Sequence, residues 1–104
     1  EIGIEFDFNS IPFFKGVFDL SRKEIYPGGL GRNRDFYSAN VEFKSRIPQY
    51  KRNLLFDPQT SGGLLIALPS IKAELLVEKL HKSKIDAALI GKVVKESAHK
   101  IVVK

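Results

Sequence analysis

The chain has 104 residues, of which 43% are hydrophobic and 28% charged, a size and balance typical of one globular domain. It contains no cysteine and two histidines, His81 and His99, which excludes a disulfide framework, a thiol nucleophile and a cysteine-based zinc site. No apolar stretch approaches the ~20 residues of a membrane span, and the N-terminus lacks the features of a signal peptide. We therefore expect a cytoplasmic protein without a membrane partner. Because the chain does not begin with methionine, we also expect a piece of a longer protein.

The net charge of +5 is concentrated in one part of the chain. Residues 32–56 carry six basic side chains against two acidic ones, Asp35 and Glu42. Such a segment is either a solvated basic face or a surface that attracts a polyanion or a nucleotide, and charge alone leaves both interpretations open.

The first half of the chain begins with a strand. Apolar residues alternate with others from Ile2 to Phe8, which is the period of a half-buried strand that ends at Asn9–Ser10. Helical spacing of apolar residues predicts a helix over 12–24. Tyr26–Gly31 then predicts a loop, because it contains one proline and three glycines. A short strand near Val41–Phe43 is also expected.

In the second half, a helical turn is expected at Gln49–Leu54. The apolar run Leu64–Leu68 predicts a central strand that is covered on both faces. Ser70 is expected to cap a helix with apolar residues at three-to-four spacing and an ion pair between Glu78 and Lys82.

The chain ends in two expected strands, Ala87–Val94 and Ile101–Val103, joined by a turn at 96–99. The interleaved order predicts an α/β (α+β) fold, in which helices pack on a mixed sheet within a single domain of residues 1–104.

The segment Asp57–Gly63, DPQTSGG, is the main candidate site. It is either an ordinary turn or a concave nest in which the hydroxyls of Thr60 and Ser61 and the amides of Gly62 and Gly63 hold a phosphate. It is not a P-loop, because no lysine follows the second glycine and a strand rather than a helix is expected after it.

A second glycine segment, Gly28–Gly31, precedes the cluster Arg32–Asn33–Arg34. The glycines fail the dinucleotide fingerprint, because a helix rather than a strand is expected before them. The two arginines are candidate phosphate ligands, since guanidinium groups bind phosphate bidentately.

The run DPQTSGGLL at 57–65 resembles a signature near the C-terminus of selenophosphate synthetases, also called selenide, water dikinases. Pro27-Gly28-Gly29 followed by Arg32-Asn33 is similar to the PGGTxRN segment of that family. The strand ALIGKV at 88–93 resembles its terminal IIGxV element. Together these motifs span most of the chain in the family's order.

The chain also departs from the family's pattern. Leu30 stands where the family usually has threonine, so a hydroxyl contact at that position is in doubt. The family's N-terminal domain, which holds its catalytic cysteine or selenocysteine, its lysine and most magnesium ligands, is absent from these residues. So is the DVTGFGLxGH segment that opens its C-terminal domain. The resemblance therefore implies an incomplete domain like the C-terminal domain of aminoimidazole ribonucleotide synthetase.

The resemblance implies a parent enzyme that converts ATP, selenide and water to selenophosphate, AMP and phosphate with Mg²⁺. It implies no catalytic residue and no tightly bound cofactor in this chain. The chain would help to close a nucleotide cleft through phosphate contacts from a set of residues in its two motifs: Thr60, Ser61, Gly62, Gly63, Arg32 and Asn33. Its main partner would be the parent's own N-terminal domain, and a homodimer is among the expected states.

Two alternatives remain open at this point. One is a nucleic-acid-binding module, in which basic residues act with stacking aromatics drawn from Tyr26, Phe36, Tyr37 and Tyr50. The other is the C-terminal domain of another ATP-using synthetase of the same superfamily. The Ser61-Gly62-Gly63 spelling disfavours the second, because those relatives carry a threonine followed by three glycines.

Overall fold

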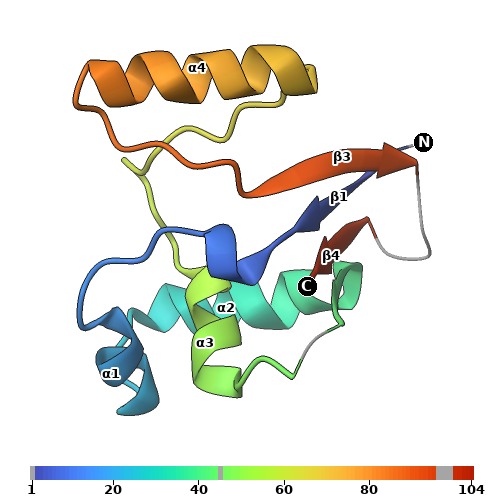
Figure 1. Ribbon diagram of the computed structural model, residues 1–104. Helices are drawn as coiled ribbons and strands as arrows, with labels where there is room; N and C mark the ends of the chain where they lie inside the picture. The colour runs from blue at the N-terminus through green and yellow to red at the C-terminus, as the bar shows by residue number, and fades with distance from the viewer. Residues whose placement is uncertain (1, 45, 96–99) are drawn as a thin grey trace.

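A four-stranded mixed sheet forms from segments that lie far apart in the sequence (Figure 1). The computed structural model describes residues 2–44, 46–95 and 100–104. Its strands are β1 Ile2–Phe6, β2 Val41–Phe43, β3 Gly91–Lys95 and β4 Ile101–Val103. The strand order is β2-β4-β1-β3, in which β4 is parallel to β1 and β2, and β3 is antiparallel to β1. These strands, with the helices packed on them, confirm the expected mixed α/β class.

The centre of the sheet is β4, although it is only three residues long. Val102 and Val103 are 2% and 1% exposed, because β1 and β2 flank the strand. The apolar cluster on one side of β4 contains Phe8 and Ile47 together with Val103. Strand β1 ends two residues earlier than expected, because Asp7 caps the short 3-10 helix η1 (Phe8–Ser10) by accepting a hydrogen bond from the Asn9 amide at 3.2 Å.

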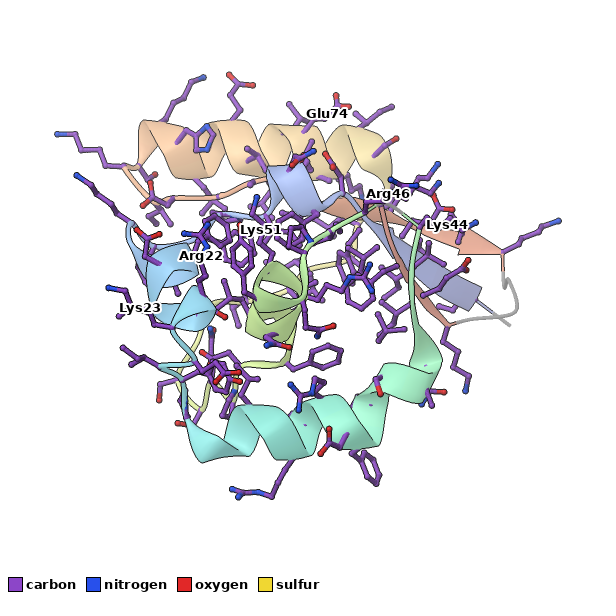
Figure 2. The ribbon with its side chains drawn as sticks, turned by 90° about the horizontal axis from the view of Figure 1, so that it is seen from below. Arg22, Lys23, Lys44, Arg46, Lys51 and Glu74 are labelled. Carbon is purple, nitrogen blue, oxygen red and sulfur yellow. The ribbon has the colours of Figure 1, made fainter. Side chains whose placement is uncertain are left out.

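The helix expected over 12–24 is shorter than its apolar spacing indicates. Helix α1 covers Val17–Arg22, because Gly16 has φ 84°, a left-handed conformation that cannot continue a right-handed helix. Its Ser21 hydroxyl donates to the Tyr50 carbonyl at 2.6 Å and so joins α1 to α3 (Gln49–Asn53). Figure 2 labels Arg22 and Lys51 where these two helices meet. The expected helical turn is confirmed, and the 3-10 helix η3 (Leu54–Phe56) continues it.

The expectation of a loop over Tyr26–Gly31 is wrong. Helix α2 covers Gly28–Tyr37 and is followed by the 3-10 helix η2 (Ser38–Asn40). Pro27 ends the preceding segment, as expected, but it also caps the new helix with extended backbone geometry, φ −62° and ψ 143°. Leu30 is completely buried, with 0% exposure, so packing of this side chain outweighs the low helix propensity of the three glycines.

The expected central strand at Leu64–Leu68 is absent from the described part of the chain. These residues form no strand and are exposed, Leu64 to 89%. Periodicity indicated a buried strand, but a strand also needs a partner to satisfy its backbone, and none of the described strands pairs with this run.

Helix α4 (Ser70–Lys82) is confirmed, and so is the Glu78–Lys82 ion pair at 2.6 Å. The N-cap is Pro69 rather than Ser70, whose side chain makes no capping bond. Both views place α4 on the opposite side of the molecule from α2 (Figure 1 and Figure 2).

The last expected strands are confirmed at Ile101–Val103 and in part at Ala87–Val94, where β3 begins only at Gly91. The turn expected at 96–99 lies outside the described residues. None of the described helices has both the length and the apolar character that crossing a bilayer requires.

Candidate functional site

The two glycine motifs, which are distant in sequence, lie against each other in the structure. The loop Asp57–Gly63 begins where η3 ends, and its first residues contact the N-terminal half of α2. Asn33 Nδ2 donates a hydrogen bond to the Phe56 carbonyl at 3.0 Å. A Cβ added to Gly29 would lie 3.0 Å from Pro58 Cγ. The start of the loop is therefore fixed to α2 by one polar contact and one close apolar contact.

Glycine at position 29 permits this close approach. A separation of 3.0 Å is tighter than normal packing allows, so a larger residue would push Pro58 and the loop away from α2. The neighbouring Leu30 points into the core, since it is fully buried. The leucine that replaces the family's usual threonine therefore contributes packing rather than a contact at the loop surface.

The distal part of the loop presents polar groups to solvent. Thr60, Ser61, Gly62 and Gly63 are all exposed, and Thr60 and Ser61 form a turn. Among the described residues, no well-formed hydrogen bond uses a backbone amide of residues 60–63. The two hydroxyls and the amides that the turn does not use can therefore donate to an anion.

Gln59 stiffens the approach to this surface. Its Nε2 donates to Asp57 Oδ2 at 3.2 Å, and its Oε1 would lie 3.0 Å from a Cβ on Gly62. Gly62 thus folds back over the Gln59 side chain, and a larger residue there would open the turn. Asp57 itself is half-buried at the start of the loop.

The arginine cluster expected from the sequence divides between two places. Residues two positions apart on a helix point about 200° apart, so Arg32 and Arg34 cannot share one face. Arg32 is exposed, and its Nη2 lies 3.7 Å from the position of a Gly29 Cβ, beside the loop. Arg34 instead lies 3.4 Å from Asn53 Oδ1 of α3. Asn33 lies between them, and its amide positions the loop through Phe56.

The residues present do not fit a magnesium site on their own. Within residues 2–44, 46–95 and 100–104, no three histidine or acidic side chains converge where they could hold a metal ion. The loop offers one carboxylate, that of Asp57, whereas protein-bound magnesium takes several oxygen ligands. What the arrangement can do is bind an anion, because it combines free amides, hydroxyls, the N-terminal end of α2 and the guanidinium of Arg32.

Comparison with known proteins identifies several relatives that carry the same name. The chain is 43% identical to "Selenide, water dikinase" of Pelobacter propionicus over 89% of its own length. It is 38% identical to the protein of that name in Caldanaerobacter subterraneus subsp. tengcongensis over 99% of its length, and 36% identical to that of Carboxydothermus hydrogenoformans over 100%. The chain spans 27% to 30% of the length of these relatives. No protein-family model matches it.

Proposed function

Because nearly all of this chain is homologous to part of selenide, water dikinase, we propose that it is the later portion of the C-terminal domain of such an enzyme. In the complete enzyme it would contribute to converting ATP, selenide and water to selenophosphate, AMP and phosphate. The observation that supports a phosphate role is the packing of α2 against the start of the DPQTSGG loop, where Arg32 lies beside the Gly29–Pro58 contact and the following residues 60–63 are exposed.

The proposed role of this surface is to bind a phosphate group. The amides of Gly62 and Gly63 and the hydroxyls of Thr60 and Ser61 would donate to its oxygens, and Arg32 would neutralise part of its charge. Phosphoryl transfer depends mainly on such positioning and charge stabilisation, so these contacts would hold ATP or its product in place. The nucleophile, the base and the metal ligands would come from the remainder of the enzyme.

The test is made in the complete enzyme that contains this chain. Arg32→Gln removes a charge-assisted contact, which typically corresponds to about 10- to 100-fold in kcat/KM for ATP. Thr60→Val combined with Ser61→Ala removes both hydroxyls, and we expect a loss of similar size. Selenophosphate and AMP formation are followed by ³¹P NMR. Lys72→Gln on α4 is the matched control for lost charge and should keep full activity.

If Arg32→Gln and the double variant Thr60→Val, Ser61→Ala both keep wild-type kinetics, the phosphate role is refuted. The proposal also expects the 104-residue chain to form no selenophosphate by itself, since it supplies binding groups only. Turnover by the isolated chain would contradict the assignment of the chemistry to other segments.

The nucleic-acid alternative has weaker support in the structure. Tyr26 and Tyr50 are half-buried, and Tyr50 lies under the Arg22 guanidinium at 4.5 Å. Phe36 and Tyr37, exposed to 76% and 53%, remain available for stacking. The names of the relatives favour the synthetase over both this module and another synthetase of the superfamily.

A further inference from the structure

A pocket of about 420 Å³ lies between α2, β2, α3 and Phe56 of η3. Two guanidinium groups, those of Arg34 and Arg52, line it, and three apolar side chains form its wall: Val41, Phe43 and Phe56. Neither the relatives' shared name nor the proposed function of the DPQTSGG loop requires such a pocket. Because the pocket has both cationic and apolar side chains, it suits a ligand with an anionic group and an apolar body.

Arg52 is held in position while its terminal nitrogens stay available. Its Nε donates to the Ile47 carbonyl at 2.7 Å, and its guanidinium stacks on the Phe43 ring at 4.8 Å. No other hydrogen bond to its guanidinium occurs among the described residues, so both Nη groups can point their donors at a ligand. A guanidinium fixed in this way loses little conformational entropy when it binds an oxyanion.

Arg34 is positioned by weaker contacts. Its Nη1 lies 3.4 Å from Asn53 Oδ1, and its Nε lies 3.4 Å from Asp35 Oδ1, both beyond the usual hydrogen-bond length. Asn53 is itself buried and fixed by Gln49 Nε2 at 2.8 Å. An incoming oxyanion can therefore replace the long contacts of Arg34 with shorter charge-assisted ones.

The charge of the pocket favours an anion over a cation. Two arginines face one carboxylate, that of Asp35, whose side chain is 76% exposed and so is well screened by water. Ser38, at the end of α2, adds a hydroxyl donor at the rim. The apolar side chains that also line the pocket would contact the body of a ligand whose charged group binds the arginines.

We propose that this pocket binds a phosphomonoester that has an aromatic or apolar body, with its phosphate held between Arg34 and Arg52. The phosphate would accept from both guanidinium groups, and the body would lie against Val41 and Phe56. No covalent step is involved. This site is separate from the loop site, so either can fail without the other.

The test titrates the purified 104-residue chain with phenyl phosphate, inorganic phosphate and phenol, and it follows binding by ¹H–¹⁵N NMR of the arginine Nε–H groups. We expect phenyl phosphate to shift the Arg34 and Arg52 signals and to bind about tenfold more tightly than inorganic phosphate, since it also buries its ring. Phenol should not bind. Equal affinity for both phosphates, or no saturable shift of the two arginines, would overturn the proposal.

Variants locate the site. Arg34→Gln should weaken phenyl phosphate binding about tenfold or more. Arg52→Lys keeps the charge but cannot bind phosphate bidentately, and it should weaken binding about three- to tenfold. Asp35→Asn should raise the affinity for phenyl phosphate about twofold, because it removes a negative charge that repels the phosphate. Lys79→Gln on α4 is the control for net charge and should leave the affinity unchanged. Circular dichroism melts verify that each variant is folded.

Arg32→Gln separates this pocket from the loop site. The phosphate-dependent shifts of Arg34 and Arg52 should persist in this variant. If they disappear, the phosphate is bound at the DPQTSGG loop and the pocket proposal is wrong, whereas the loop proposal is not affected.

Discussion

Glu5 joins three segments of the sheet through one carboxylate. Its Oε2 accepts from Lys104 Nζ at 2.8 Å and lies 3.4 Å from Lys92 Nζ, so β1 is tied to β3 and to the residue after β4. Its side chain is 19% exposed. The pKa of Glu5 is lowered mainly by the hydrogen bond from Lys104, and Lys92 lowers it further. Partial desolvation of the carboxylate raises the pKa, but by less than the two lysines lower it.

The sign of this shift predicts how stability depends on pH. A carboxyl whose pKa is lower in the folded state than in the unfolded state stabilises the fold when the pH is above its unfolded pKa, about 4.3. This stabilisation is lost as the pH falls through the folded-state pKa. Lys104→Met should therefore raise the pKa of Glu5 toward its ordinary value and destabilise the chain at neutral pH. The difference from wild type should shrink as pH falls through the lowered pKa of Glu5.

Carboxyl ¹³C titration by NMR measures the pKa of Glu5, and urea denaturation at several pH values measures the stability. Lys72→Met, on the exposed surface of α4, is the control and should leave that pKa unchanged. An unaltered Glu5 titration in Lys104→Met would show that the ion pair does not persist in solution.

The pairing of strands β1 and β3 requires a glycine, which has no side chain, at position 91. A Cβ on Gly91 would collide with the Glu5 carbonyl oxygen and lie 3.1 Å from Phe6 Cα, both of them backbone atoms that cannot move aside. Gly91→Ala should therefore separate the strands and cost about 1–3 kcal/mol of unfolding free energy. Gly31→Ala is the matched control, because nothing lies within 4 Å of its Cβ position inside α2.

We expect Gly31→Ala to be neutral or to stabilise the chain by about 0.4–1 kcal/mol, since alanine loses less backbone entropy in a helix. Urea denaturation compares the two variants. Equal stability of both would mean that β3 can shift its register to admit a methyl group.

The elements that could be predicted from the sequence are those with a strong local pattern. Alternation identified β1, and three-to-four spacing identified α4. The helix at Gly28–Tyr37 was missed because its main stabilising contribution, the burial of Leu30, is a tertiary contact that glycine propensities hide. The length of α1 was overestimated, because spacing does not report the left-handed backbone at Gly16.

The candidate site was predictable in its parts but not in its assembly. Motif spelling identified Arg32 and the DPQTSGG loop, and the structure places them together through Gly29 and Pro58. The sequence suggested that Arg34 acts with Arg32, although helical geometry alone would have separated them once the helix was known. Arg34 and Arg52 line the same pocket only through the tertiary fold, and no local pattern in the sequence shows this.

For the molecule as a whole, apolar burial is unevenly distributed. One core cluster joins residues of the sheet, η1, α1 and η3, whereas large apolar side chains between residues 64 and 89 remain exposed: Leu64, Leu65, Ile66, Leu68, Ile71, Leu75, Ile85 and Leu89. A continuous exposed apolar surface marks a place where another surface docks. The relatives are more than three times as long as this chain, so they contain further segments beyond the part that it matches.

We therefore propose that the remainder of the complete enzyme covers this surface and supplies a strand beside Leu64–Leu68. Hydrogen exchange tests this: the amides of this run should exchange near intrinsic rates in the 104-residue chain and at least about 10³-fold more slowly in the complete enzyme. The amides of β4 should be protected in both and serve as the internal control, because Val102 and Val103 are buried in the chain itself. Fast exchange of Leu64–Leu68 in the complete enzyme would refute strand pairing. Protection that appears in the isolated chain only at high concentration would identify a second copy, rather than the missing segment, as the partner.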